Sequence, residues 1–454
     1  GAVDADYFEA MAAGVDASWT CDRISVLFET LGRAGLFREL GQRIHTIHPA
    51  LTGFLRSVVL GKTPAEVRDR WTRGFVDICA SLSDEAAPLP LHEQRAFFEA
   101  YGSTLWHALA ESRRLGMDAQ MASLLQGLAI FALNTRSFAA ADGLYQQLHE
   151  WASRTKQPQA EAMASHQLGV VAHECRDLKT AEQWFHRSLE IKKQLGDEDG
   201  TASTFYHLGM VAHQQGDFET AERLYRMSME ISEHLPNKRW AALVYHQLAA
   251  IAQQRGDLDS AEKWCNRSLE IEKRFGTAQG LAGAYHLLGV VAQRRGDLKA
   301  AERSYRLSLE VSTRHKYEHG IAITCHQLGM VAQERNDFEA AERWYHMSLG
   351  THERLGNKYW GAVTYAQLGL LAAARKQYRV AIEWLAKAGA TFVRLNDLHN
   401  LTHTISNVAD IVHQAPALER ESLLRIWTTA ELPPVPPELL EGERDGPTNE
   451  GSGS

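Results

Sequence analysis

The sequence lacks long apolar runs, abundant cysteine and an excess of positive charge. No apolar stretch approaches the ~18 residues that a membrane-spanning helix needs, so we expect no part of the chain to cross a membrane. The five cysteines include no Cys-X-X-Cys pair that would suggest zinc or redox chemistry. Lys and Arg number 48 against 56 Asp and Glu, and a chain with a net charge of −8 is a poor general binder of nucleic acid.

Catalytic motifs and a secretory signal are also missing. The sequence contains neither Gly-X-Ser-X-Gly nor His-Glu-X-X-His, and no paired carboxylates stand outside charged helix faces. The first residues do not show the positively charged segment followed by an apolar segment that is typical of a signal peptide. We therefore expect a cytoplasmic, non-enzymatic chain without a cofactor or a metal, and the least favoured alternative is a catalytic domain in residues 1–120. Because the chain starts at Gly and ends in Gly-Ser-Gly-Ser, we also expect it to be a piece of a longer protein.

The sequence does have a 40-residue period, which runs from about residue 121 to residue 400. A fixed period in this range indicates a stack of similar supersecondary units, none of which can bury its apolar face alone. Two columns are invariant in all seven rows, and they hold Leu128, Leu168, Leu208, Leu248, Leu288, Leu328 and Leu368, and Ala141, Ala181, Ala221, Ala261, Ala301, Ala341 and Ala381.

One unit, residues 161–200, predicts two helices joined by a tight turn. Small and apolar residues recur every three or four positions over 162–172, which indicates the first helix. Gly-Asp or Asn-Asp then follows in four of the other units, at 216–217, 256–257, 296–297 and 336–337. Gly or Asn can end a helix in the left-handed conformation, and Asp can cap the next one. The second helix runs from about Ala181 to Leu195, and Gly196 ends it.

The residue sizes predict how the helices pack. Gly169 and Ala181 lack bulk, so the two helices of a unit can approach closely. The aromatic residue four positions after the invariant Ala, Phe185 in this unit, is large enough to reach the next unit.

The order Leu-Gly, Gly-Asp, Ala-Glu and then an aromatic residue resembles the tetratricopeptide repeat. That family's unit has 34 residues, so this chain is similar to a longer-helix variant, over about residues 121–400. The resemblance implies an all-α fold: a right-handed α-solenoid, or superhelix, of helix-turn-helix repeats. Around the seven repeats we expect a helical linker and a degenerate repeat at 63–120, capping helices at 401–431 and a disordered Pro-rich acidic tail at 432–454.

Residues 1–62 do not repeat. A predicted helix over 24–37, a short strand over 41–49 and a helix over 50–60 resemble the end of the winged-helix domain in signal-transducing ATPases with numerous domains (STAND, NB-ARC type). In that family the segment joins the ATPase to a C-terminal repeat array. The resemblance implies a winged-helix-like remnant at residues 1–62 and an ATPase module upstream.

The tetratricopeptide resemblance also implies that the first helix of each unit lines a concave groove. Its groove positions fall on polar residues, which suit an extended peptide or protein segment because neutral His, Gln and Tyr can donate and accept hydrogen bonds. Alternatively, the histidines recur only because the unit was duplicated, and they are partly buried and inert. The candidate ligand-binding residues are His166, Tyr206, His246, His286 and His326, then His173, His213, Gln253, Gln293 and Gln333 seven positions on, and Arg294.

Two functions from different classes follow from these resemblances. The first is a protein- or peptide-binding sensor domain of a STAND-type regulatory ATPase, in which ligand binding relieves autoinhibition and the readout is signal transduction such as bacterial defence. Its partners would be the ligand and its own upstream ATPase module, with neither nucleic acid nor membrane. The second is a stand-alone adaptor scaffold for assembling protein complexes.

Overall fold

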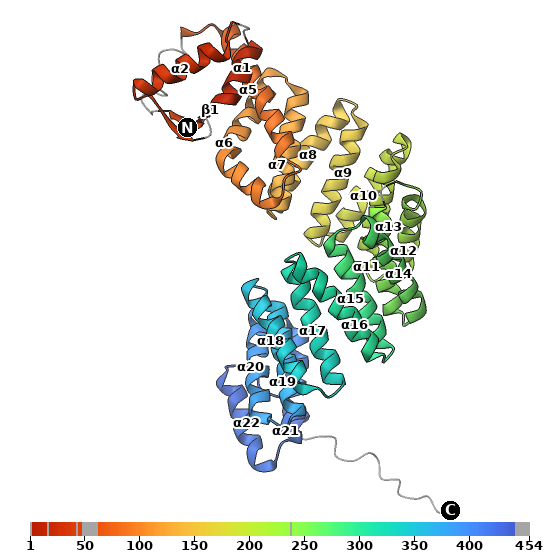
Figure 1. Cartoon of the computed structure of the whole chain (residues 1–454). Coiled ribbons are helices and arrows are strands. Elements are labelled where there is room, and N and C mark those ends of the chain that lie inside the picture. Colours follow the sequence, from red (N-terminus) through yellow and green to blue (C-terminus); the bar gives the residue numbers. More distant parts are fainter. Residues whose placement is uncertain (1, 16–17, 42–43, 48–61, 237, 441–454) are drawn as a thin grey trace, which may run out of the picture. The chain divides into compact units, whose positions relative to one another are not determined.

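The computed structural model describes residues 2–15, 18–41, 44–47, 62–236 and 238–440 (Figure 1). The chain divides into two compact units, Gly1–Ala221 and Glu222–Ser454, and the boundary falls within helix α12 (Phe218–Ser232). Almost every described element is a helix, and the helices after residue 62 follow one another as antiparallel pairs. The predicted solenoid of paired helices is therefore confirmed.

The first unit starts with a small mixed motif. Strands β1 (Ala2–Asp4), β2 (Phe37–Gly41) and β3 (Ile44–Ile47) form an antiparallel sheet in the order β1-β3-β2. Helices α1 (Ala5–Val15) and α2 (Cys21–Arg33) accompany the sheet. The strand predicted over 41–49 corresponds to β3, and α2 corresponds to the predicted helix over 24–37. The helix predicted over 50–60 lies outside the described residues.

Aromatic side chains hold this motif to the helix that follows. The rings of Phe8 and Phe28 meet edge to face at 5.6 Å, and Phe28 meets Phe37 in the same way at 5.0 Å. Trp71 of the next helix stacks on Phe8 at 6.2 Å. Such pairs stabilise a small core beyond the burial of their area, so the mixed motif packs as part of the first unit.

The rest of the first unit consists of paired helices. The segment 63–120 is itself a pair of long helices, α5 and α6, and the regular 40-residue units begin after it. The helices are α5 (Ala65–Ala86), α6 (Leu91–Leu115), α7 (Asp118–Asn134), α8 (Phe138–Arg154), α9 (Pro158–Glu174), α10 (Leu178–Leu195) and α11 (Glu198–Gln214).

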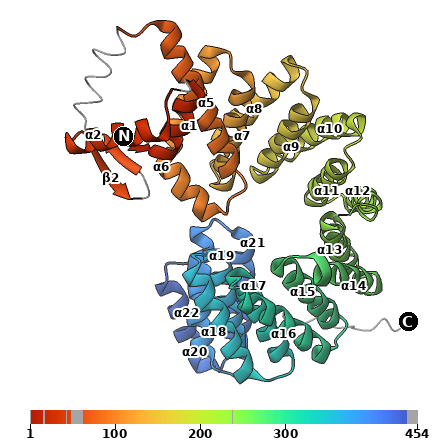
Figure 2. The same cartoon turned by 45° about the horizontal axis from the view of Figure 1, so that its top comes forward.

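The second unit continues the same alternation to the C-terminal helices (Figure 2). Its helices after α12 are α13 (Arg239–Gln254), α14 (Leu258–Phe275), α15 (Ala278–Arg294), α16 (Leu298–Arg314), α17 (Glu318–Glu334), α18 (Phe338–Arg354), α19 (Lys358–Ala374), α20 (Tyr378–Arg394), α21 (Leu398–Gln414), α22 (Ala417–Thr429) and α23 (Pro437–Leu440).

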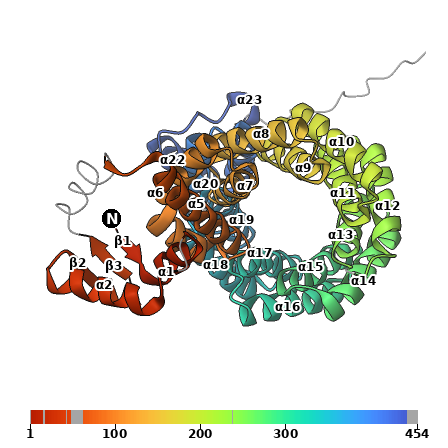
Figure 3. The same cartoon turned by 90° about the horizontal axis from the view of Figure 1, so that it is seen from above.

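Within this unit the first helices of successive repeats form one layer. Helix α15 contacts both α13 and α17. Helices α14 and α16 form a second layer, which covers one side of the first (Figure 3). We call the first helix of a repeat helix A and the second helix B. The side chains that face away from helix B on α13, α15 and α17 therefore form a continuous wall.

The turn inside each repeat has the predicted conformation. Gly256 and Gly296 have φ of 80° and 79°, and Asn336 has φ of 60°, so each ends helix A in the left-handed region. The next residue caps helix B: the Oδ1 of Asp297 accepts a hydrogen bond from the N–H of Ala300 at 2.9 Å, and Asp337 does the same for Ala340 at 3.0 Å. These caps satisfy backbone donors that a helix start leaves without partners.

The Gly column is a close contact between helices A and B. A Cβ on Gly289 would lie 2.5 Å from the ring of Tyr305, and one on Gly329 would lie 2.6 Å from the ring of Tyr345. The ring of Tyr305 also packs with Leu328 of the next repeat. It therefore contacts two neighbouring repeats, as its size predicts. In these two repeats glycine lets the aromatic ring lie this close to the backbone of helix A.

A buried serine on helix B ties the two helices of a repeat together. Ser188 donates a hydrogen bond to the backbone carbonyl of Ala162 at 2.8 Å. The same bond recurs 120 and 160 residues later along the chain, where Ser308 bonds Ala282 at 2.9 Å and Ser348 bonds Ala322 at 2.8 Å. The recurrence of serine is thus explained by packing, because a buried hydroxyl needs a partner.

The C-terminal helices cover the last repeat. Trp427 of α22 is fully buried, and its Nε1 donates to the carbonyl of Pro433 at 2.8 Å. Within the segment predicted as a disordered tail, Leu432 and Val435 are buried in the same core, and α23 follows them. Ordered packing therefore continues to residue 440, and residues 441–454 lie outside the described residues. In the described part of the chain, no helix is both long and apolar enough to cross a bilayer.

Candidate functional site

The first polar column of the groove is divided between buried and half-buried side chains. His166, Tyr206 and His326 keep less than a tenth of their surface, whereas His246 and His286 are half-buried. All five lie on helix A of successive repeats, as the sequence predicts. The three buried members therefore have little area left for a ligand.

The buried histidines contact the next repeat and their own helix B. The Nδ1 of His326 lies 3.3 Å from the Oγ1 of Thr364, one repeat further on, and its ring lies 5.5 Å from that of Tyr345. His166 makes the equivalent contact with Thr204 at 3.3 Å. These contacts support the alternative that the histidines of this column pack between repeats. They are made by His166 and His326, the first and the last histidine of the column.

Burial keeps these imidazoles neutral. It lowers the pKa of His246, His286 and His326 to about 4, and it also lowers the pKa of His166. The charged form is disfavoured because it would leave water without gaining a counter-charge. At neutral pH each ring is therefore both a hydrogen-bond donor and an acceptor.

The second polar column is oriented by the aromatic residues of helix B. The hydroxyl of Tyr305 donates to the Oε1 of Gln293, and that of Tyr345 donates to the Oε1 of Gln333, both at 3.0 Å. The Nε2 of Gln293 in turn donates to Glu334 at 2.5 Å. The glutamines are thus fixed by a bond that the sequence alone did not indicate, although Tyr and Gln recur together at a spacing of 12.

The remaining candidates lie at the end of helix A. Arg294 is exposed, and its guanidinium donates to the backbone carbonyl of Gln253 at 3.0 Å, so it links two neighbouring repeats. His173 and His213 are half-buried and belong to the first unit, as do His166 and Tyr206. The candidate residues therefore fall into two sets, one in each unit.

The structure brings His246 and His286 together in a cavity of about 840 Å³. The cavity opens between the first halves of helices A in three consecutive repeats, α13, α15 and α17, and is closed by the ends of α14 and α16. Its lining is mixed: Leu243, Ile323 and Leu287 are apolar, whereas the two histidines and several hydroxyl and amide groups are polar. Neutral polar groups within an apolar wall are typical of a ligand pocket.

Glycines occupy three positions of the cavity wall. Gly280, Gly283 and Gly320 line the cavity, and in the flanking repeats the first of these positions is occupied by Trp240 and Trp360. A Cβ on Gly283 would meet only His246, at 3.5 Å, which is an ordinary contact. Gly283 therefore borders open space, whereas a Cβ on Gly280 or Gly320 would lie 2.2 Å from Glu272 or 2.4 Å from Tyr317, so these two glycines make room for those side chains.

Glu272, near the end of α14, also lines the cavity. Its carboxylate accepts a hydrogen bond from the N–H of Thr277 at 3.1 Å. Burial raises the pKa of this carboxyl, and the hydrogen bond from Thr277 opposes the shift. A Cβ on Gly276 or Gly280 would lie 1.7 Å or 2.2 Å from a carboxylate oxygen, so both glycines are needed where this side chain lies.

Glu272 belongs to a buried column that sequence analysis did not single out. The residues 40 positions apart here are Lys192, Ser232, Glu272, Ser312 and His352, and the other four are buried. The signal was present in the sequence: one column near the end of helix B changes its chemical type from repeat to repeat, whereas the column two positions before it is Glu in four of the same five repeats. Burial of these side chains is what identifies the column as facing the next repeat.

In the first unit the equivalent residue is already paired. The Nζ of Lys192 donates to the Oγ1 of Thr204 at 3.1 Å and to the carbonyl of Gly200 at 3.3 Å. Burial lowers the pKa of this amine to about 8. Lys192 therefore serves contacts inside the array, whereas Glu272 faces a cavity.

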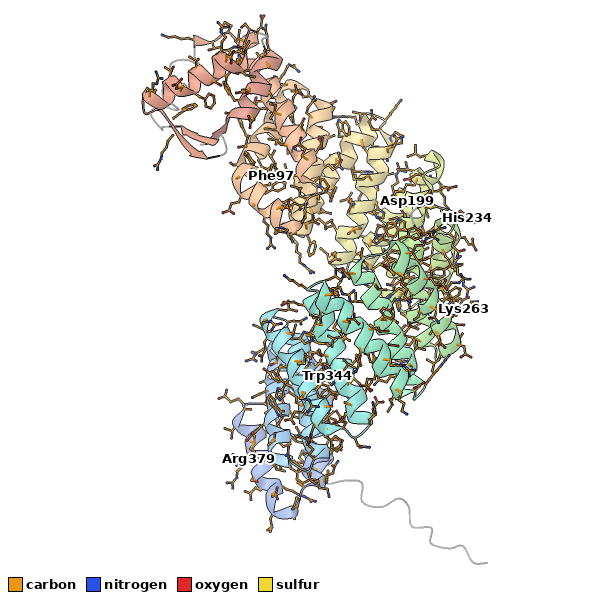
Figure 4. The ribbon with its side chains drawn as sticks, viewed as in Figure 1. Phe97, Asp199, His234, Lys263, Trp344 and Arg379 are labelled. Atoms are coloured by element: carbon orange, nitrogen blue, oxygen red, sulfur yellow. The ribbon has the colours of Figure 1, made fainter. Side chains whose placement is uncertain are left out.

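A second, smaller cavity lies between α16, α17 and α18. It has a volume of about 280 Å³ and is bounded by Trp344 of α18 (labelled in Figure 4) and by Arg306, whose guanidinium lies 5.9 Å from the Trp344 ring. It also contains Arg335, which pairs with Glu302. Its charged groups are largely paired with one another, so it is a weaker candidate than the cavity at Glu272. Among the described residues no group of three or more His, Cys, Asp and Glu is placed to hold a metal ion.

Comparison with known families agrees with this geometry. A family model described as tetratricopeptide repeat matches residues 160–234 and 240–314, and a second model with the same description matches 321–355. Over these matched residues the chain is built of tetratricopeptide repeats. Since the repeats run in phase with the helix pairs, helices A and B are the two helices of each tetratricopeptide unit. A search among curated proteins found no match to the chain.

Several solved structures share the tetratricopeptide fold of the chain. RapI in its apo form is 13% identical, with a TM-score of 0.54 over 78% of this chain and 98% of that one. A STAND protein with a tetratricopeptide repeat sensor from Pyrococcus horikoshii is 14% identical, with a TM-score of 0.53 over 95% of this chain and 65% of that one. The apo form of the quorum sensor NprR from B. thuringiensis is 11% identical, with a TM-score of 0.52 over 89% and 97%. At these identities the likeness shows the fold alone.

Proposed function

We propose that this chain is a protein- or peptide-binding sensor, and that its ligand enters the cavity between α13, α15 and α17. The observation that carries the proposal is the cavity itself, about 840 Å³ in volume and lined by His246, His286 and apolar side chains. Ligand pockets in proteins have volumes of roughly 300–1,000 Å³ and combine apolar walls with a few polar groups. The neutral histidines can donate and accept hydrogen bonds beside the apolar walls, which suits a segment of a peptide.

We further propose that the sensor regulates a STAND-type ATPase. The STAND protein from Pyrococcus horikoshii is described as having a tetratricopeptide repeat sensor, and its likeness extends over 95% of this chain. The three-stranded sheet with α1 and α2 supports the same assignment, because a winged-helix-like motif is expected at such a junction. NprR, which shares the fold, is described as a quorum sensor. Ligand binding would relieve autoinhibition only if the ligand binds the active conformation more tightly than the autoinhibited one. A ligand with equal affinity for both conformations does not change their populations.

The binding proposal is tested by selecting short random linear peptides on the full chain and measuring their affinity by calorimetry. His246→Ala combined with His286→Ala removes two polar groups from the cavity wall, so we expect affinity to fall about tenfold or more, since each hydrogen bond contributes about 1 kcal/mol. The matched control is His399→Ala with His403→Ala, because these two histidines are exposed on α21 and lie outside the cavity. Equal affinity of the double cavity variant and the control would refute the site.

The regulatory proposal has a separate test in the reading frame that precedes residue 1. A phosphate-binding loop encoded upstream, followed by ATPase activity that the selected peptide stimulates in the full-length protein, is the expected result. A start codon near residue 1, with peptide binding retained, would instead favour an adaptor scaffold.

A further inference from the structure

The cavity between α13, α15 and α17 carries one formal charge. Of the side chains that line it, Glu272 alone is an acid, and no lysine or arginine lines the same space. Among the described residues Glu272 takes part in no ion pair, and its one hydrogen bond comes from the backbone of Thr277. Elsewhere in this array acids are routinely paired, as Glu262 is with Arg295.

The carboxylate of Glu272 lies against the backbone of two glycines. Gly276 and Gly280 leave room for its two oxygens, and any larger side chain at either position would overlap them. Gly276 has an extended backbone at the end of α14, whereas Gly196 and Gly356 have positive φ at the corresponding turns. The turn after α14 thus differs from its counterparts at the place where the acid sits.

The rest of the lining suits an aliphatic stem. Leu243, Ile271 and Ile323 supply apolar surface, and Phe275 at the end of α14 is 59% exposed beside the cavity. A side chain with an apolar stem and a cationic end can bury its methylene groups while its charged end reaches a carboxylate. Lysine and arginine are the two amino acids of this kind.

We propose that the cavity is a subsite for one lysine or arginine side chain of a peptide ligand, with Glu272 as the counter-ion. This inference rests on the proposed peptide-binding function and specifies its ligand chemistry. An incoming cation gives the half-buried carboxylate the partner that it does not have in the array, and it meets no competing positive charge in the cavity. Because the equivalent column carries Lys192, Ser312 and His352 in other repeats, the subsite belongs to this repeat alone.

The test is selection of short random linear peptides on the full chain, followed by a double-mutant cycle on one selected peptide. Selection on the wild type should enrich lysine or arginine at one position. Replacing that residue by citrulline, or by norleucine for lysine, should weaken binding tenfold or more. In Glu272→Gln, which keeps the size of the side chain and the bond from Thr277, the same replacement in the peptide should change affinity less than twofold.

Two variants serve as controls. Glu270→Gln removes an acid two residues away on the same helix, but Glu270 is exposed and pairs loosely with Arg267 at 3.7 Å, so the preference for a basic residue should persist. Gly283→Leu should abolish binding of the basic peptide, because its side chain would occupy the cavity; leucine already stands at the equivalent position 243. Circular dichroism melting confirms that each variant is folded.

The outcomes are distinct. Enriched peptides without a preferred basic residue, or a cycle in which Glu272→Gln and the neutral peptide are additive, would overturn the subsite while leaving peptide binding in place. Failure to enrich any peptide would overturn the proposed function and the subsite with it. Binding of spermidine that depends on Glu272, without enrichment of peptides, would overturn the assignment to a peptide side chain.

Discussion

The contact between Gly289 and Tyr305 allows the packing of helices A and B to be tested with a single methyl group. A Cβ on Gly289 would lie 2.5 Å from the ring, whereas ordinary van der Waals contact begins at 3.4 Å, so the ring must retreat by about 0.9 Å. Tyr305 is fully buried and its hydroxyl donates to Gln293. The substitution Gly289→Ala should therefore strain the core and break this hydrogen bond.

The magnitude follows from a comparison with Gly283→Ala on the same helix. Both substitutions remove a glycine from the interior of α15, which by itself stabilises a helix by about 1 kcal/mol. A Cβ on Gly283 makes only an ordinary contact with His246, so this variant should keep the whole gain. Overpacking a core costs about 1–3 kcal/mol, so Gly289→Ala should be less stable than Gly283→Ala by that amount.

The assay is hydrogen exchange of the backbone amides of α15 and α16, because repeat arrays open locally and one global free energy of unfolding describes them poorly. The two variants should differ in protection roughly 5- to 150-fold, since about 1.4 kcal/mol corresponds to a factor of ten. Equal protection of the two variants would refute the reasoning.

Two other repeats supply a rescue and an internal check. Ala249 stands where five of the seven repeats have glycine, and the aromatic position of the same repeat is Cys265. Gly289→Ala with Tyr305→Cys copies this pair and should recover most of the protection. In the first repeat Ala129 coexists with Tyr145, whose hydroxyl has no partner among the described residues, so that ring is not tethered in the way that Tyr305 is.

Three further predictions concern the stability of the second unit. Arg335→Ala, which removes the ion pair with Glu302 on the preceding repeat, should lower the local free energy of unfolding by about 0.5–1 kcal/mol in hydrogen exchange at low salt, and the loss should shrink in 1 M NaCl; a loss independent of salt would contradict an electrostatic origin. Burial lowers the folded-state pKa of His326 from 6.5 to about 4, so the unfolded chain takes up the proton first and stability should fall as pH drops through this window, by about 1 kcal/mol at pH 5.5. Thermal melts at pH 7.5 and 5.5 should show a smaller difference for His326→Gln than for the wild type, and an unchanged difference would show that this group does not contribute. Trp427→Ala should cost about 3–5 kcal/mol and expose α20 to exchange, because the indole is fully buried against the last repeat and bonded to Pro433; protection of α20 equal to wild type would contradict its role as a cap.

The helices and turns of the array could be predicted from the sequence because they depend on short-range chemistry. Gly296 and Asp297 lie within one turn of the groups that they satisfy, so their spacing alone indicates a left-handed helix end followed by a cap. The Gly column indicated a close approach of helices A and B, and the structure identified the ring that fills it. The strand β3 was also predictable from alternation, although its partner β1 was not, because the two are separated by 39 residues of sequence from Asp4 to Ile44.

The candidate site was predictable only in part. The columns with His246, His286 and the glutamines were placed correctly on helix A, but the division of each column into buried and accessible members was not visible in the sequence. His166 and His326 are buried because a threonine of the next repeat lies against each of them. Gln293 and Gln333 are fixed by tyrosines of helix B. Helical period gives the face of a helix, whereas burial depends on what the neighbouring repeat places opposite that face.

The sequence by itself determined the repeat, its two helices and the wall to which each column belongs, because periodicity and capping act within about 40 residues. The tertiary structure alone decided where that wall is hollow. The cavity at Glu272 is lined by residues of α13, α15 and α17, with open space beside Gly283, so it exists only where three repeats are stacked. The same stacking buries Lys192 among its partners and leaves Glu272 facing a cavity. Only in the folded array do side chains of different repeats come together around one cavity. Their volumes set its size and the charge of Glu272 sets the ligand chemistry that we propose.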